Sequence, residues 1–253
     1  MEFMLLSPGS DIGAGVRNYR GFGLMASARY CFGFWEERGL NLEEMIYDFD
    51  AEGVIVDAGA FPTGGIPLRI MRDGKRVVCC DGAADRYIEM VGEPWRIVGD
   101  CDSISVDNRL RYADILRRFP DQETNDQTKA VRYLASKGVR RIAIVGATGL
   151  REDHTIGNVS LLIEYMKMGL DVRIFTDYGL FLPVCDGGRF ECGEGKQVSI
   201  FNFGARGIAA HGLRYPLRDF DSWWEGTLNE SVSDSFSLEC QGYLLLFISY
   251  DRK

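Results

Sequence analysis

Short apolar runs alternate with helical patterns between residues 54 and 176 of the sequence. Most of these runs are rich in Val and Ile, and each is followed by a loop and an amphipathic segment. Strands that alternate with helices in this way form a parallel sheet covered by helices. We therefore expect a Rossmann-like parallel α/β domain whose strands include residues 54–56, 77–80, 96–98, 141–145 and 172–175.

The segment that ends at Gly138 gives the clearest helical pattern. Asn125 or Asp126 can cap its first turn, because a short polar side chain accepts hydrogen bonds from the free backbone N–H groups there. Val131 and Leu134 recur at helical spacing and belong to one apolar stripe. Gly138 is a typical residue at the end of a helix, and a strand begins within three residues of it.

The pattern changes after about Pro183. Short strands punctuated by glycine follow one another there, with no helical segment between them. This pattern is typical of an antiparallel sandwich or barrel. The expected strands cover residues 189–192, 197–203, 208–215, 235–240 and 243–249.

These two patterns divide the chain into three segments. We expect the α/β domain over residues 51–183 and an antiparallel β-sandwich over residues 184–253, with turn signals at 178–179 and 186–188 beside the boundary. Residues 1–50 follow neither pattern and form an N-terminal extension of unassigned role. This extension is either an appended helix and loop or a stretch that precedes a physiological start at Met45.

Composition and charge exclude several classes of protein. The 253 residues are 46% hydrophobic and 26% charged, which is typical of a globular chain and excludes disorder, collagen and coiled coil. The net charge of -8 disfavours nucleic acid and anionic lipid as partners, and the basic pairs at 117–118 and 140–141 do not change this. The sequence has no apolar stretch of about 18 residues, so we expect no membrane span. Seven cysteines without CxxC spacing indicate reduced thiols in a cytoplasmic protein.

Acidic residues follow the second and third expected strands. Asp81 and Asp85 come after the second strand, and Asp100 and Asp102 come directly after the third. Ligands of parallel sheets bind at the carboxyl ends of the strands, and side chains two positions apart in an extended chain point to the same side. A carboxylate pair that close needs a cation, and Mg²⁺ fits because it prefers oxygen ligands. Asp126 is a third candidate ligand. The alternative, a turn or helix cap, is the interpretation we favour for Asp85.

The fourth strand leads into a turn of small residues. Residues 146–149 read Gly-Ala-Thr-Gly and precede a helical segment. Such a turn lets backbone N–H groups approach a phosphate, and Arg151 could add a bidentate contact. Alone this turn is a weak signal, because it is neither a P-loop nor a GxGxxG motif. His154 alone is more typical of a structural histidine than of a catalyst.

Taken together, these motifs resemble those of thiamine pyrophosphokinases, the enzymes that transfer a diphosphate group from ATP to thiamine. The order and spacing of the matching segments fit that family over roughly residues 54–250. The matching segments are residues 61–63, 66–69, 80–83, 99–103, 121–122, 126, 146–158, 212–217 and 226–230.

The resemblance implies an N-terminal α/β nucleotide domain, a C-terminal β-sandwich and a homodimer that binds thiamine where two subunits meet. It implies that Asp100, Asp102 and Asp126 hold Mg²⁺, and that ATP is the co-substrate. It also implies contacts with ATP or the transferred diphosphate by Asp81, Gln122, Thr148, Gly149, Arg151, Asp153, His154 and Asn158. The catalytic residues would then be Asp81, Asp100, Asp102, Asp126 and Arg151, with Asp81 or Asp100 as the proton acceptor.

Thiamine carries a cationic thiazolium and a flat pyrimidine, which call for an aromatic face and a few polar groups. Trp223 and Trp224 can supply the face; adjacent residues of a strand point to opposite sides, so we expect one to stack on thiamine and the other to pack inward. Thr227 and Asn229 are the expected polar contacts. The family has Ser where this chain has Leu228, so Thr227 would have to replace that hydroxyl.

A second departure follows the first strand, where the family usually has Ala-Asn-Gly and residues 57–59 are Asp-Ala-Gly. The resemblance nevertheless predicts an ATP:thiamine diphosphotransferase that forms thiamine diphosphate and AMP. Two alternatives remain open. One is a related pyrophosphotransferase that acts on another alcohol, and the other is a binding module for thiamine or a nucleotide without catalysis.

Overall fold

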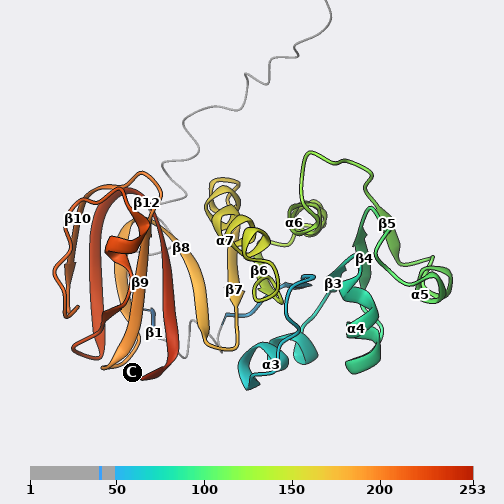
Figure 1. Cartoon of the computed structure of the whole chain (residues 1–253), viewed down its shortest axis with the longest axis horizontal. Helices are drawn as coiled ribbons and strands as arrows, with labels where there is room; N and C mark the ends of the chain where they lie inside the picture. The colour runs from blue at the N-terminus through green and yellow to red at the C-terminus, as the bar shows by residue number, and fades with distance from the viewer. Residues whose placement is uncertain (1–39, 42–48, 253) are drawn as a thin grey trace, which may run out of the picture.

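A computed structural model describes residues 40–41 and 49–252 of the chain (Figure 1). Nearly all of the expected N-terminal extension, including Cys31 and Met45, lies outside these residues. The described strands form one 12-stranded sheet, in the order β11-β9-β12-β8-β7-β6-β2-β3-β4-β5, with β1 (Leu40–Asn41) beside β8 and β10 beside β12. The expected fold class, a parallel α/β region followed by an antiparallel β-sandwich, is confirmed.

The parallel half of the sheet contains all five strands expected there. Its strands are β2 (Gly53–Val56), β3 (Val77–Cys80), β4 (Arg96–Gly99), β5 (Leu116–Arg118), β6 (Arg141–Val145) and β7 (Asp171–Phe175). Its helices are α3 (Gly65–Asp73), α4 (Ala83–Met90), α5 (Val106–Arg111), α6 (Asp126–Ser136) and α7 (Glu152–Lys167). We had not expected β5, because its Leu-Arg-Arg sequence carries no apolar pattern.

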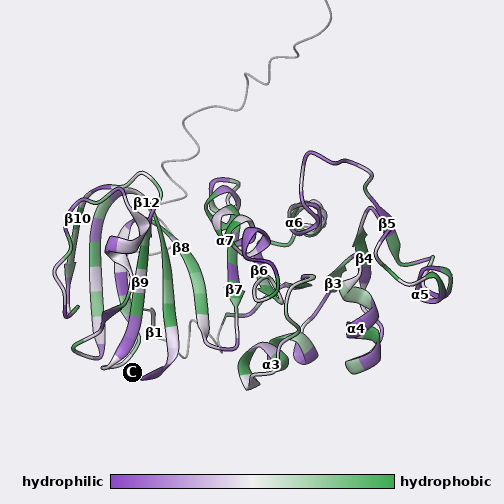
Figure 2. Cartoon of the chain, in the orientation of Figure 1, coloured by the Kyte–Doolittle hydropathy of each residue, from purple (hydrophilic) through white to green (hydrophobic). Residues whose placement is uncertain are grey.

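Helices cover both faces of the parallel strands, which explains why β2 and β3 are continuous apolar runs buried at every position. Val54 and Val56 pack in one apolar cluster with Met71 of α3, whereas Ile55 packs in a second cluster with Leu134 of α6. In Figure 2 the helices of this half carry both apolar and polar residues, as expected of helices with one face on a sheet and one face in solvent. Burial of apolar area on both faces is the main force that holds this half together.

Helix α6 has the cap that the sequence predicts. The Asn125 side chain accepts a hydrogen bond from the backbone N–H of Thr128 at 2.9 Å. Val131 and Leu134 are fully buried, and Gly138 follows the helix with φ +81°. The cap fixes where the helix begins, and therefore places Asp126 at its first position.

The antiparallel half contains β8 (Gly179–Glu191), β9 (Lys196–Asn202), β10 (Arg206–His211), β11 (Asn229–Glu230), β12 (Ser235–Arg252) and the short 3₁₀ helix η1 (Trp223–Gly226). The strands expected over 235–240 and 243–249 are one strand, β12, with an irregularity between Glu239 and Tyr243. This irregularity explains why the apolar pattern of the sequence breaks there.

Strand β8 runs through the expected domain boundary at residue 183. Its first residues pair with β7 on one side, through Leu180 opposite Phe175, and β12 pairs with its other side from Gly179 to Glu191. Asp186 and Gly187, which we took as turn signals, lie inside β8 with φ +59° and +94°. The division of the chain at residue 183 stays a prediction.

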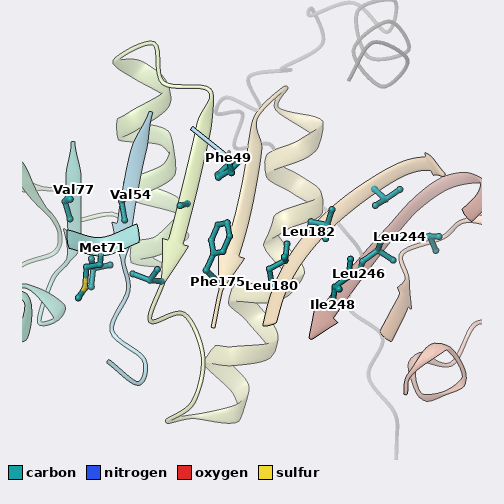
Figure 3. Packing of buried hydrophobic residues seen from close by; sticks show 14 of the residues in the cluster. Phe49, Val54, Met71, Val77, Phe175, Leu180, Leu182, Leu244, Leu246 and Ile248 are labelled. Atoms are coloured by element: carbon teal, nitrogen blue, oxygen red, sulfur yellow. The ribbon is translucent and has the colours of Figure 1, made fainter. Parts of the chain in front are cut away.

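One apolar cluster crosses from the parallel half into the antiparallel half (Figure 3). Val54 and Phe175 belong to it on the parallel side, and Leu180, Leu246 and Ile248 belong to it on β8 and β12. The parallel and antiparallel halves therefore share one apolar core. None of the helices within residues 49–252 combines the length and the apolar character that crossing a bilayer requires.

Candidate active site

The candidate site lies at the carboxyl ends of the parallel strands. The sheet order places β2 between β6 and β3, so chain connections leave in opposite directions on its two sides. Such a point opens a crevice where parallel α/β proteins bind ligands. The loops after β2, β3, β4, β5 and β6 all begin at this edge. They carry the acidic and glycine motifs that are predicted to bind the nucleotide.

Three carboxylates meet at this edge. One oxygen each from Asp81, Asp100 and Asp102 lies within 4.8 Å of the other two. Asp81 is buried, with φ +38°, and its oxygens accept hydrogen bonds from the backbone N–H groups of Ser103 (3.1 Å) and Ile104 (3.2 Å). Burial raises the pKa of Asp81, and the charge of Asp126 adds to that rise.

Asp100 and Asp102 point to one side, but not because the chain is extended. Strand β4 ends at Gly99, and the buried Cys101 has φ +66°, so a left-handed residue brings the two carboxylates together. Gln122 donates to Asp100 at 3.2 Å, and this hydrogen bond lowers the pKa of Asp100. Asp100 therefore stays ionised and available to a cation.

Asp126, the third predicted ligand, is not one of these three grouped carboxylates; it lies near Asp81 and is paired with a lysine. Its Oδ1 accepts from Lys129 Nζ at 2.9 Å. A Cβ on Gly99 would lie 2.9 Å from the Asp81 Cβ and 3.4 Å from the Asp126 Cγ, so only a glycine fits between them. Our sequence analysis missed Lys129, although its position three residues after Asp126 on a helix was a signal for such a pair.

The turn after β6 packs against the loop that follows β2. The backbone N–H groups of Gly59 and Ala60 donate to the carbonyls of Gly146 (2.7 Å) and Thr148 (2.8 Å). Gly149 has φ +87°, and its N–H donates to Thr155 Oγ1 at 3.3 Å. These backbone contacts define the shape of the turn predicted to approach phosphate.

Arg151, Asp153 and His154 lie exposed at the start of α7. Arg151 donates to both oxygens of Asp153, at 3.1 and 2.6 Å, and this contact lowers the pKa of Asp153. The backbone N–H of His154 also donates to Asp153 at 3.0 Å. Asp153 thus fixes the direction of a solvent-exposed guanidinium at the edge of the site.

Asn158 connects three strand-end segments from a buried position. Its Nδ2 donates to Asp57 Oδ2 (3.1 Å) and to the Ala147 carbonyl (3.0 Å), and its Oδ1 accepts from Asn125 (2.8 Å). Burial raises the pKa of Asp57 to about 6, and the charge of Asp126 adds to this rise. The hydrogen bond from the Ala58 N–H acts in the opposite direction and lowers the pKa. Asp57 and Asn125 were not among the predicted site residues.

The residues predicted for thiamine lie in the antiparallel half. Trp223 and Trp224 belong to η1 and not to a strand, so the expected alternation does not apply. Trp223 packs on Phe203, donates from Nε1 to the Asn202 carbonyl at 3.2 Å and is 39% exposed, whereas Trp224 is 75% exposed. Trp223 is therefore held by its neighbours, whereas most of the Trp224 side chain is in contact with solvent.

Thr227 and Asn229 flank Leu228. Thr227 Oγ1 donates to the Trp224 carbonyl at 2.7 Å. The buried Asn229 amide bonds the N–H and the carbonyl of Tyr215, at 3.0 and 2.8 Å. Leu228 is 61% exposed with φ +60°. Figure 1 shows this region and the loops after β4 and β5 at opposite ends of the molecule, so a single chain does not bring the two sets of residues together.

Two family models match the chain in sequence order. The model described as "Thiamin pyrophosphokinase, catalytic domain" matches residues 68–174, and "Thiamin pyrophosphokinase, substrate-binding domain" matches residues 179–247. Together they cover most of the chain.

Curated relatives and solved structures agree with these models. Thiamine pyrophosphokinase 1 of Oryza sativa subsp. japonica is 28% identical over an alignment of 130 residues, and the match covers 42% of this chain and 49% of that protein. Thiamin pyrophosphokinase 1 of Caenorhabditis elegans is 29% identical over an alignment of 119 residues, and the match covers 44% of this chain and 49% of that protein. In both cases the chain spans about half the length of the curated relative that it matches.

Crystal structures of similar fold cover more of the chain. Yeast thiamin pyrophosphokinase superposes with a TM-score of 0.69 at 18% identity, over 84% of this chain and 91% of that one. Thiamine pyrophosphokinase from Bacillus subtilis superposes with a TM-score of 0.64 at 20% identity, over 79% and 99%. At these identities the structural likeness establishes the fold.

Proposed function

Because the chain belongs to the thiamin pyrophosphokinase family, we propose that it transfers the diphosphate group of ATP to the hydroxyl of thiamine, giving thiamine diphosphate and AMP. The observation that carries this proposal is the convergence of Asp81, Asp100 and Asp102 at the carboxyl edge of the sheet. ATP reacts as a complex with a divalent cation. An enzyme that transfers its phosphates therefore needs a group of oxygen donors to hold that cation.

The donor set fits Mg²⁺. Its carboxylate oxygens are hard ligands, and Asp100 and Asp102 are accessible from solvent, which leaves coordination positions for phosphate and water. Asp100 and Asp102 would hold the ion, with Asp126 as the third ligand that the resemblance implies once Lys129 gives up its contact. When bound, Mg²⁺ supplies neutralisation of the charge on the polyphosphate.

The hydroxyl oxygen of thiamine forms a bond to the β-phosphorus of ATP, and the bond from that phosphorus to the α,β-bridging oxygen breaks. AMP leaves with the electron pair of the broken bond. The hydroxyl proton passes to a carboxylate, for which Asp81 and Asp100 are the candidates. Asp81 is the stronger base of the two, because burial raises its pKa whereas the Gln122 bond lowers that of Asp100.

The remaining predicted nucleotide residues divide by chemistry. Arg151 offers a bidentate donor to phosphate oxygens, and Asp153 orients it. Thr148 and Gly149 belong to the turn after β6 at the same edge, where the Gly149 N–H donates to Thr155 Oγ1 at 3.3 Å and would have to exchange that partner for a phosphate oxygen. Gln122 positions Asp100, Asn158 holds the turn at Ala147, and His154 lies exposed in the first turn of α7.

Trp224 is the better candidate to stack on thiamine. Its exposed indole can cover a cationic thiazolium ring, whereas Trp223 is held by Phe203 and Asn202. Asn229 would contact the pyrimidine only by exchanging a bond to Tyr215, so Thr227 is the more accessible polar partner. Loss of Trp224 in a Trp224→Ala variant should raise KM for thiamine more than KM for ATP.

The distance between the two halves of the site favours a homodimer. The antiparallel half, which contains η1, and the loops after β4 and β5 lie on opposite sides of one molecule, so thiamine bound near Trp224 would meet the carboxylates of a second copy (Figure 1). The proposal places the enzyme in the cytoplasm, where ATP is available and thiols such as Cys79 and Cys80 stay reduced. Light scattering of the purified chain should give twice the mass of one chain.

Product analysis tests the proposed reaction. Purified protein is mixed with Mg²⁺, ATP and thiamine, and nucleotides and thiamine phosphates are separated by chromatography, with EDTA and thiamine-free controls. We expect AMP and thiamine diphosphate in equal amounts, and only with metal. ADP with thiamine monophosphate would contradict the proposal. AMP formation with another alcohol but not with thiamine would favour the related pyrophosphotransferase, and nucleotide binding without turnover would favour a binding module.

A further inference from the structure

Asp85 lies in the first turn of α4, four residues after Asp81, and no role in the reaction has been given to it so far. Its Oδ2 accepts from the Ser105 backbone N–H at 2.8 Å. Its Oδ1 accepts from the Ser105 hydroxyl and from Asn108 Nδ2, both at 2.7 Å. Three short hydrogen bonds to one ionised carboxylate are a strong connection, because charged acceptors bind donors more tightly than neutral ones.

Asp81 and Asp85 together hold three consecutive amides of one loop. Asp81 accepts the N–H groups of Ser103 and Ile104, and Asp85 accepts that of Ser105. Asp81 lies in the turn after β3, just before α4, and Asp85 lies in the first turn of α4, so carboxylates on both sides of the start of this helix hold the loop. The loop at residues 100–105, which presents Asp100 and Asp102, is thus anchored to α4 at its far end.

This loop would not hold its shape unaided. Cys101 has φ +66°, a conformation that residues other than glycine adopt only when the surroundings impose it. Asp100 and Asp102 repel each other, and neither forms a salt bridge with any residue in 49–252. The nearby arginines reach only backbone oxygens, Arg118 that of Asp100 and Arg109 that of Cys101. Gln122 donates to Asp100 at 3.2 Å and the Ser103 hydroxyl donates to Asp102 at 2.8 Å, and the anchors on residues 103–105 add to these contacts in opposing the repulsion.

We propose that Asp85 is a positioning residue, which holds the loop at residues 100–105 so that Asp100 and Asp102 can share one divalent cation. The role of the cation rests on the proposed function. The competing interpretation is that Asp85 only stabilises the start of α5, where Ser105 is the capping residue and accepts from Asn108 N–H at 3.3 Å. A purely structural cap would change the stability of the protein and leave cation affinity unchanged.

The test measures cation binding without ATP or thiamine. Binding of Mn²⁺, a paramagnetic stand-in for Mg²⁺, is followed by electron paramagnetic resonance for the full chain and for Asp85→Ala, Asp85→Asn and Asp107→Ala. Asp107 is a matched control, because it is an exposed aspartate of α5 outside these contacts. We expect Asp85→Ala to weaken Mn²⁺ binding about 10-fold or more, as loss of an outer contact to a metal ligand does. Asp85→Asn should weaken Mn²⁺ binding less than Asp85→Ala does, because an amide oxygen can still accept from Ser105, without the charge of the carboxylate, while the Asn108 amide turns over.

Hydrogen exchange gives a second, metal-free readout. The amides of residues 103–105 should exchange about 10-fold faster in Asp85→Ala and at the wild-type rate in Asp107→Ala, since an opened loop exposes them. Unchanged exchange and unchanged Mn²⁺ affinity in Asp85→Ala would overturn the proposal, as would a wild-type chain that takes up no Mn²⁺. If Asp85→Ala does not fold, Asn108→Ala decides, because it removes one of the three bonds: weaker Mn²⁺ binding supports the proposal and unchanged binding overturns it. A chain that binds Mn²⁺ but forms no thiamine diphosphate would refute the proposed function and leave the anchor intact.

Discussion

Two loops at the same edge of the sheet are built in opposite ways. The loop at residues 100–105 follows β4 and is held by side-chain carboxylates, since Asp81 and Asp85 accept its backbone N–H groups. The turn at residues 146–149 follows β6 and is held by backbone bonds to Gly59 and Ala60. The first presents Asp100 and Asp102, and the second leads to Arg151.

The difference reflects what each loop has to bind. A loop that gathers carboxylates must resist their repulsion, so it needs strong and charged anchors. A turn that admits a phosphate must keep its backbone close to the ligand, so its shape depends on small residues and on left-handed positions such as Gly149. Changes of charge should therefore damage the first loop, and an added Cβ should damage the second.

The largest effect is expected from Asp100→Asn or Asp102→Asn. Either change removes a charged ligand from the proposed cation site, and turnover should fall about 1000-fold. Both side chains reach solvent, so the melting temperature should change little. Asp107→Asn serves as a control of equal charge change. Wild-type turnover in both variants would show that the loop after β4 does not hold the catalytic cation.

Asp57 sharpens the comparison where the loops after β2 and β6 meet. Burial raises its pKa to about 6 from 3.8, so the folded protein retains a proton that the unfolded chain has lost. Stability from this group is complete below about pH 4 and is lost as the pH rises through 6. At pH 8, Asp57→Asn should raise the free energy of unfolding by about 3 kcal/mol, since each unit of pKa shift is worth about 1.4 kcal/mol.

Urea unfolding of wild type and Asp57→Asn at pH 4.5 and pH 8 checks this. The difference between the two proteins should shrink at the lower pH. Asp171→Asn is unsuitable as a control because Asp171 pairs with Arg173, so the exposed Asp73→Asn is used. A stability difference that is the same at both pH values would show that Asp57 does not titrate in this range.

Variants of Arg151 test whether a positive side chain beside the turn after β6 binds phosphate. Arg151→Ala should lower kcat/KM for ATP about 100-fold, and Arg151→Lys should recover part of it, because lysine supplies the charge without the bidentate geometry. Steady-state kinetics with varied ATP give these values. Asp153→Ala is the companion variant, since it leaves the guanidinium in place but removes its orientation. An Arg151→Ala enzyme with wild-type kcat/KM would mean that phosphate is held by the backbone alone.

Gly149→Ala is the smallest expected effect. The new Cβ would lie 2.9 Å from the Ala60 Cβ at a residue with φ +87°, which should cost about 1 to 2 kcal/mol of stability. Gly157→Ala in α7 is the matched control: its Cβ would meet no atom within 4 Å, and alanine should leave stability unchanged or raise it by about 1 kcal/mol. Thermal unfolding compares the two. An equal change of stability in both variants would mean that the turn after β6 has room for a Cβ at residue 149.

Local patterns in the sequence predicted the parallel strands and α6, because buried runs and a capped amphipathic helix carry their own signals. Strand β5 was missed because its pairing with β4, and not its own composition, makes it a strand. The pair of Asp57 and Asn158 spans 101 positions, and such contacts depend on the sheet order. The tryptophans were assigned to a strand because the local sequence does not distinguish a 3₁₀ turn from an extended segment.

The candidate site shows the same division. The carboxylates, the glycine turn and Arg151 were predicted from their positions after strands, and the structure places their loops at one edge of the sheet. What the sequence did not reveal is the support beneath them. The sequence made Asp81 a catalytic candidate and Asp85 a turn or helix cap, and only the folded chain shows that both hold the loop that carries Asp100 and Asp102.

The most direct test of the proposed reaction follows the phosphorus atoms of ATP. ATP labelled with ³²P at the α or the β position is incubated with protein, Mg²⁺ and thiamine, and the products are separated. Our account predicts that the β label passes to thiamine diphosphate while the α label stays in AMP. A β label that remains in ADP would mean transfer of the γ-phosphate alone, and it would contradict attack at the β-phosphorus.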